Sequence, residues 1–122
     1  MILVDTSVWI DHLRAGDAEL AALLNGSQVL MHPFVLGELA CGNLRNRAEV
    51  LALLKDLPGA ALANNEEVLF FIERHALMGR GMGYVDAHLL AAVTLGGMTK
   101  IWTRDKRLRA VADALALAYG KD

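Results

Sequence analysis

Apolar residues fall into short runs that alternate along the chain with longer stretches in which they recur every three or four positions. Short continuous runs are typical of buried strands, and the longer recurring pattern is typical of helices packed on a core. The first run, Ile2-Leu3-Val4, ends at Asp5-Thr6-Ser7, a sequence that suits the start of a helix. The pattern predicts strands over residues 2–4, 29–31, 60–63 and 100–103, a first helix that ends near residue 14, and helices over residues 17–24, 33–41, 47–54, 64–78, 84–95 and 105–117.

This alternation of strands and helices predicts a parallel sheet with helices on both faces. The strands are continuously apolar, which agrees with burial on both sides of the sheet. The chain has no internal repeat, linker or low-complexity tract, and 122 residues fit one domain of ordinary size. We therefore expect an α/β fold: a single domain over residues 1–122, with a mostly parallel central sheet between two helical layers.

The apolar runs and the single cysteine indicate in which compartment the protein is expected. No apolar run approaches the roughly 18 residues that a membrane span requires. The opening apolar run meets Asp5 too early for a secretory signal and has no basic segment before it. The single cysteine, Cys41, excludes an internal disulfide. These features predict a cytoplasmic protein without a membrane partner.

Charge is distributed unevenly, although the formal net charge is only −2. Residues 74–109 hold seven basic side chains and two acidic ones, Asp86 and Asp105, whereas residues 1–73 hold four basic and ten acidic side chains. An enzyme that binds cations in a carboxylate cluster and a polyanion around it would show this arrangement. A solvated face on the last helix is the ordinary alternative.

Two acidic residues follow predicted strands, and ligands of open α/β sheets bind beyond the carboxyl ends of the strands. Asp5 comes directly after the first strand, and Asp105 lies two residues past the last. If those strands are neighbours, the two carboxylates converge at one edge of the sheet. Taken singly, each aspartate is also well explained as a helix N-cap.

Two further acids fall inside the apolar arcs of predicted helices. On a helical wheel, Glu38 lies between Phe34 and Cys41, and Asp86 lies between Leu89 and Val93. A carboxylate that faces a core is costly unless it is paired or bound to metal. A buried ion pair with an arginine is the structural alternative for both.

Four acids gathered at one site repel one another, so the arrangement predicts bound cations. Ligands that are all oxygen select a hard divalent ion such as Mg²⁺ or Mn²⁺. The chemistry that such a site performs on a polyanion is hydrolysis of a phosphodiester. The sequence leaves open whether one or two ions bind.

Four segments together resemble a known family. Val4–Ile10, Glu38–Gly42, Gly83–Ala91 and Thr103–Leu108 are similar, in this order, to the acidic motifs of PIN domains, and especially of the VapC toxins of prokaryotic toxin–antitoxin pairs. The likeness extends from the first strand to the final helix. It implies a mostly parallel sheet between helices and a magnesium- or manganese-dependent endoribonuclease that acts on structured RNA such as transfer RNA.

The resemblance also implies roles for individual residues. Asp5, Asp86 and Asp105 would be metal ligands, and Glu38 would position the metal or the attacking water. The hydroxyls of Thr6, Ser7 and Thr103 would support these acids. The usual partners would be a cognate antitoxin, which inserts a C-terminal segment over the active site, and a second copy of the chain in a homodimer.

Basic residues near the acids are candidates for contacts to RNA. Arg80 lies in the loop Gly79–Gly83, which follows a predicted helix and therefore does not match a dinucleotide-binding loop. Arg104 and Arg107 flank Asp105. The four histidines show no zinc-binding spacing and predict packing or surface positions.

Other functional classes fit less well. A signalling receiver domain needs adjacent acids after the first strand, where this chain has Asp5-Thr6, and an aspartyl phosphatase needs a second aspartate where Ser7 stands. A PIN-like module that only binds or regulates a partner, without nuclease activity, stays open. Metal-dependent cleavage abolished by Asp5→Asn would separate the nuclease from this alternative.

Overall fold

Three short parallel strands form the centre of the protein: β1 (Ile2–Val4), β2 (Val29–Leu30) and β3 (Lys100–Trp102). The structure is a computed structural model, and it describes residues 1–120. The strand order is β2-β1-β3, with Ile2 opposite both Val29 and Lys100. The first and last strands are therefore neighbours, so the residues that follow them emerge side by side.

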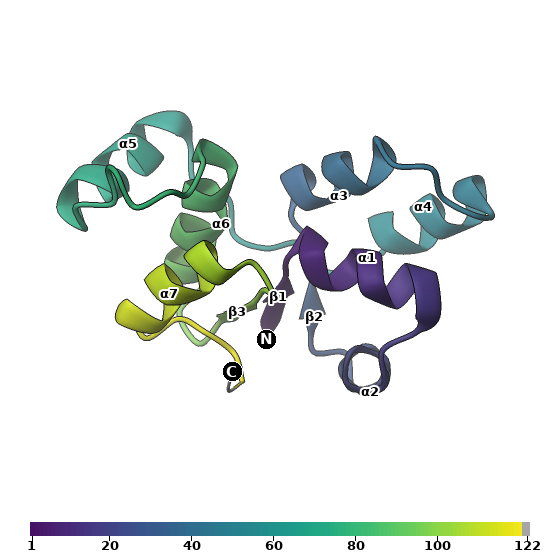
Figure 1. Cartoon of the computed structure of the whole chain (residues 1–122). Coiled ribbons are helices and arrows are strands. Elements are labelled where there is room, and N and C mark those ends of the chain that lie inside the picture. Colours follow the sequence, from purple (N-terminus) through teal and green to yellow (C-terminus); the bar gives the residue numbers. More distant parts are fainter. Residues whose placement is uncertain (121–122) are drawn as a thin grey trace.

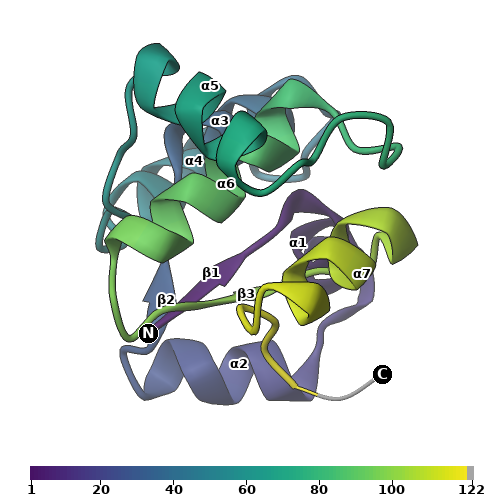
Figure 2. The ribbon, with the colours of Figure 1, turned by 90° about the vertical axis from the view of Figure 1, so that its left-hand side faces the viewer.

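Helices connect these strands and cover both faces of the sheet. In Figure 1, α6 and α7 lie beside β3, while α1 and α2 lie on the side of β2. In Figure 2, α5 and α6 lie on one side of the strands, and α2 and α7 lie on the other. The helices are α1 (Thr6–Ala15), α2 (Ala18–Asn25), α3 (Pro33–Ala40), α4 (Arg47–Lys55), α5 (Asn65–Arg74), α6 (Tyr84–Leu95) and α7 (Lys106–Ala114).

The core is built around β1 and α6. Every residue of β1 is buried, and α6 is buried continuously from Ala87 to Val93. Trp9 and Trp102 are also core residues, at 2% and 8% exposure. Burial of apolar surface on both faces of a parallel sheet confirms the predicted three-layer α/β fold.

Local chemistry accounts for several helix boundaries. The Asp17 side chain accepts a hydrogen bond from the Leu20 amide at the start of α2. Asn64 and Glu67 form a reciprocal capping box at the start of α5. Such caps satisfy amides that have no partner inside the helix.

Three predicted elements were wrong in part. The last helix, α7, ends at Ala114 rather than residue 117, because Ala116 adopts a left-handed φ of 59° and the Leu117 amide turns back to the Ala112 carbonyl. Residues 60–63 form no strand; the contact with the sheet is a single bridge between Met31 and Gly59, which leaves the following residues outside the ladder. Helix α5 ends at Arg74 rather than residue 78, because Ala76 adopts a left-handed φ of 51° and the Leu77 amide turns back to the Ile72 carbonyl. None of the helices described in residues 1–120 is long and apolar enough to cross a bilayer.

Candidate active site

Asp5 lies at the carboxyl end of β1, with 7% of its surface exposed. It occupies the N-cap position of α1, but its side chain makes no capping hydrogen bond. Instead its Oδ2 atom accepts hydrogen bonds from Ser7 Oγ at 2.8 Å and from Thr103 Oγ1 at 2.7 Å. Within residues 1–120 this one oxygen accepts both of the side-chain hydrogen bonds that Asp5 receives, so Oδ1 is available to another ligand.

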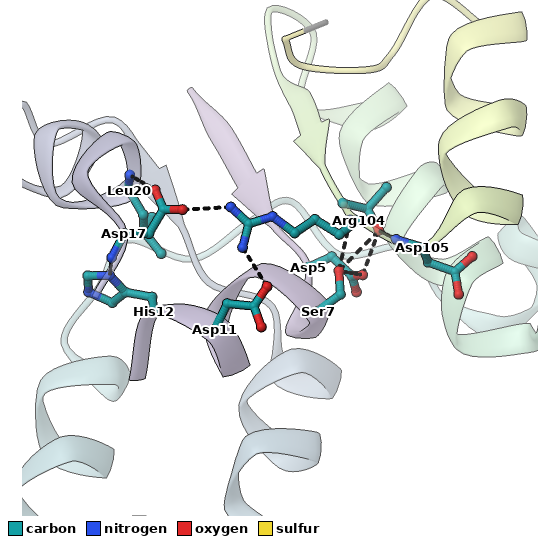
Figure 3. A network of polar contacts seen from close by, with 9 residues as sticks. Asp5, Ser7, Asp11, His12, Asp17, Leu20, Arg104 and Asp105 are labelled. Carbon is teal, nitrogen blue, oxygen red and sulfur yellow. Dashed lines mark hydrogen bonds and ion pairs between the residues drawn. The ribbon is translucent and has the colours of Figure 1, made fainter. Parts of the chain in front are cut away.

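Two consecutive backbone amides orient these hydroxyls. The Arg104 amide donates to Ser7 Oγ at 2.9 Å, and the Asp105 amide donates to Thr103 Oγ1 at 3.0 Å. A hydroxyl that accepts an amide proton is free to direct its own proton elsewhere, and here both direct it to Asp5. Figure 3 shows this cluster where β3 runs into α7. The segment after β3 thereby fixes the carboxylate that follows β1.

Asp105 is the N-cap of α7, as the capping alternative predicted. Its Oδ1 atom accepts from the Leu108 amide at 2.9 Å. The residue is exposed, and in Figure 3 its carboxylate points away from Asp5. Capping occupies one oxygen, and the second oxygen is still available to a ligand.

Glu38 occupies a more open position than the helical wheel predicted. The wheel placed it toward the core, but Glu38, Phe34 and Cys41 are all exposed, because only Val35 and Leu39 of α3 are fully buried. Its Oε1 atom accepts from Thr6 Oγ1 at 2.8 Å. That hydrogen bond ties α3 to the first turn of α1, beside Asp5.

Asp86 is half-buried in the first turn of α6, and its Oδ2 atom accepts from the Gly83 amide at 3.2 Å. Burial raises the pKa of this carboxyl, and the negative charges of Asp5, Asp105 and Glu38 raise it further. Each of the other three predicted acids therefore lies near enough to Asp86 to raise its pKa.

No arginine or lysine neutralises these four acids within residues 1–120, where the ion pairs join Arg104 to Asp11 and Asp17, and Arg109 to Asp113. The predicted alternative of a buried ion pair is therefore wrong for Glu38 and Asp86. Over the same residues, no three acidic, histidine or cysteine side chains are gathered tightly enough to hold an ion among themselves. Each of the four carboxylates instead accepts at least one hydrogen bond from the protein.

The donor set fits a hard divalent cation. Carboxylate oxygens are the ligands that Mg²⁺ and Mn²⁺ prefer. Asp5 is held with one oxygen turned from its hydroxyl partners, while Asp86 carries a charge that its surroundings disfavour. A cation bound between them would relieve that repulsion.

The three candidate arginines have different surroundings. Arg80 is exposed in the loop before α6. Arg107 Nη1 lies 3.5 Å from the Gly81 carbonyl, so it packs against the same loop. Arg104 makes two 2.6 Å ion pairs, with Asp11 and Asp17.

Sequence reasoning missed this Arg104 arrangement and a buried histidine pair. His32 and His88 are 3% and 4% exposed, and Phe34 lies between their rings, with centroids at 5.1 and 4.8 Å. Burial, with a smaller effect of His88, lowers the pKa of His32 to about 4. The predicted packing role for both residues holds, but no spacing in the sequence indicated that His32, the N-cap of α3, and His88 of α6 would lie near each other.

Comparison with known proteins places these features in a family. The PIN domain family matches residues 2–114. Ribonuclease VapC32 of Mycobacterium tuberculosis, in strains CDC 1551 / Oshkosh and ATCC 25618 / H37Rv, is 48% identical over 122 residues, covering 100% of this chain and 98% of the relative. The chain therefore belongs to the PIN-domain family.

Proposed function

We propose that this protein is a divalent-metal-dependent endoribonuclease, the toxin of a toxin–antitoxin pair. The observation that carries the proposal is that Asp5, Asp105 and Glu38 all lie near enough to Asp86 to raise its pKa, while no ion pair in residues 1–120 neutralises any of the four acids. The end-to-end relationship to a ribonuclease supports hydrolysis of RNA rather than another phosphodiester.

In this proposal Asp5, Asp86 and Asp105 hold Mg²⁺ or Mn²⁺, and Glu38 positions the ion or the attacking water. When bound, such an ion would supply the means to lower the pKa of the attacking water and to neutralise charge that develops on the phosphate. Ser7 and Thr103 keep Asp5 in one orientation through its Oδ2 atom. Thr6 restrains Glu38 in the same way through Oε1.

The RNA would approach from the exposed side of the acids. Arg80 is open to solvent in the loop before α6, which also carries the Gly83 amide that holds Asp86. Arg107 lies against the loop that carries Arg80, so the two cations could hold phosphates next to the scissile one. Arg104 is the weakest of the three candidates because both of its terminal nitrogens are already in ion pairs. Transfer RNA is the substrate class that the family resemblance favours.

A cognate antitoxin is the proposed protein partner. A hollow of about 410 Å³ begins at Glu38 and extends between α1 and the turn after α3, lined by apolar side chains and two arginines. Its position supports an antitoxin segment that covers the acids from this side. The lining includes Ile10, Leu13, Arg14, Leu39, Arg45 and Val50.

A homodimer is proposed on separate grounds. Helix α5 buries Val68 and Phe71 but leaves Leu69 and Phe70 57% and 67% exposed. A mostly apolar hollow of about 340 Å³ lies between α5 and α6 beside Phe70. An exposed apolar face of this kind supports association with a second copy of the chain.

The proposed location of the toxin and its antitoxin is the cytoplasm.

The direct test is to incubate the purified protein with total RNA and Mg²⁺ or Mn²⁺, and to sequence the cut ends. We expect discrete cleavage that EDTA and Asp86→Asn both abolish. The second candidate, a PIN-like module that only binds its partner, would be favoured if folded, antitoxin-free protein cut no RNA pool with either metal.

A further inference from the structure

Arg104, which lies between Thr103 and Asp105 in the chain, contacts α1 at two places. Its backbone amide donates to Ser7 Oγ at 2.9 Å, and Ser7 Oγ donates to Asp5. Its Nη1 atom lies 2.6 Å from Asp11 Oδ2. Ser7 and Asp11 are four residues apart on α1 and so lie on the same face, one turn from each other. One residue therefore holds this helix at two successive turns.

The second arm of the guanidinium extends the restraint to α2. Nη2 lies 2.6 Å from Oδ2 of Asp17, whose Oδ1 caps α2 through the Leu20 amide. The Leu20 hydrogen bond and then Arg104 lower the pKa of Asp17, so the carboxylate stays charged. In Figure 3 the Arg104 side chain runs from the Asp5–Ser7 cluster to both aspartates. The Trp102 ring, 5.5 Å from the guanidinium carbon, supports it from β3.

We propose that Arg104 is a positioning residue: by fixing the rotation of α1 against β3, it holds Ser7 on Asp5 and so prepares Asp5 to bind the metal ion. A turn of α1 about its axis would carry Ser7 Oγ away from the Arg104 amide and from Asp5 Oδ2. Thr103 would then be the one hydroxyl that still donates to Asp5. The Asp5 carboxylate would lose the orientation that directs Oδ1 away from the hydroxyls. This inference rests on the proposed metal-binding function, and it differs from a contact between Arg104 and RNA.

The test measures Mn²⁺ binding to RNA-free protein, from the electron paramagnetic resonance signal of free Mn²⁺. RNA affinity is measured separately in EDTA, by fluorescence anisotropy at two salt concentrations. Arg104→Gln should weaken Mn²⁺ binding on the order of tenfold, the low end of what loss of an outer support costs a metal site. Asp11→Asn should weaken it in the same direction by less, and RNA affinity in EDTA should change by less than about twofold.

Arg109→Gln is the control, because it breaks the other arginine–aspartate ion pair of residues 1–120, and hydrogen bonds to the Tyr119 and Gly120 carbonyls, without touching Asp5 or Ser7. Asp11 is half-exposed, so Asp11→Asn decides the question if Arg104→Gln fails to fold. Unchanged Mn²⁺ binding in both variants, with weaker and less salt-dependent RNA binding by Arg104→Gln, would overturn the proposal in favour of an RNA contact. Absence of Mn²⁺ binding by the unaltered protein would instead overturn the proposed metal site, and this inference with it.

Discussion

The Thr103 hydroxyl donates a 2.7 Å hydrogen bond to Oδ2 of Asp5, across 98 positions of the chain. Thr103 follows β3 and Asp5 follows β1, and these strands are neighbours in the sheet. The register that pairs Val4 with Trp102 therefore brings the two side chains together at the same edge. A contact in the core of the fold thus sets the orientation of a proposed metal ligand.

Thr103→Val should destabilise the protein by about 1–3 kcal/mol, the usual cost of leaving buried polar groups without their partner. The substitution keeps the shape of the side chain but removes a donor to Asp5 and the acceptor of the Asp105 amide. Thr103→Ser keeps the hydroxyl and serves as the control. Urea unfolding measures both, and a Thr103→Val stability equal to that of Thr103→Ser would contradict the prediction.

Asp86→Asn should stabilise the metal-free protein while abolishing cleavage. Burial and the neighbouring acids raise the pKa of Asp86, so its ionised form opposes folding, and asparagine still accepts from the Gly83 amide. We expect a gain of about 1 kcal/mol near pH 7, the usual size for relief of an unfavourable charge. The gain should shrink as pH falls through the raised pKa, because protonation relieves the same charge. Thermal unfolding in EDTA tests this, and a destabilised variant would refute it.

His32 should make the protein sensitive to mild acid. Its folded pKa of about 4 lies below its ordinary value of 6.5, so its contribution to stability is complete above pH 6.5 and is lost as pH falls toward 4. Between pH 7 and pH 5 the loss from this residue is roughly 2 kcal/mol. The unprotonated Nδ1 atom also accepts from the Phe34 amide at the start of α3, so protonation removes a helix cap.

His32→Asn isolates that effect, because asparagine is a good helix cap and carries no titratable group. Urea unfolding at pH 7 and pH 5 should show a smaller decrease in the free energy of unfolding than in the unaltered protein. His88, whose pKa burial also lowers, is unchanged in this variant and accounts for part of the decrease that persists. Equal decreases in the two proteins would show that folding does not lower the pKa of His32.

Gly81→Ala should lower both stability and cleavage. Gly81 has a φ of +81°, and a Cβ there would lie 2.7 Å from Arg107 Cδ. The loop ends at Gly83, whose amide holds Asp86, so displacement of the loop reaches the site. We expect a loss of about 1–2 kcal/mol from backbone strain and the clash.

Gly79→Ala provides the matched comparison, because Gly79 has a similar φ of +73° with open space around its Cβ. The difference between the two variants in thermal unfolding and in cleavage rate measures the Arg107 contact. If both variants cleave RNA equally, packing of Arg107 against Gly81 does not affect Asp86.

Periodicity and strand-end chemistry were sufficient to predict the layers of the fold and the position of Asp5 and Asp105 after neighbouring strands, but not the Asp105 carboxylate, which points away from Asp5. The turn at Ala76 and the single bridge at Gly59 could not be predicted from the sequence, because both depend on contacts made after folding. The wheel of α3 failed at Glu38, since a short helix at the edge of the fold buries only a narrow stripe. Arg104 gave no local signal because its partners Asp11 and Asp17 lie on the first two helices.

The central claim is that four acids act together on RNA through a bound divalent ion. Its most direct test is the single-turnover cleavage rate of one mapped RNA in Mn²⁺, for Asp5→Asn, Glu38→Gln, Asp86→Asn and Asp105→Asn, with the exposed Asp56→Asn as control. The account predicts that each of the four loses at least about a hundredfold in rate, as expected for groups that act as a unit, while the control cleaves normally. Cleavage at the normal rate by any two of the four, or cleavage unaffected by EDTA, would contradict it.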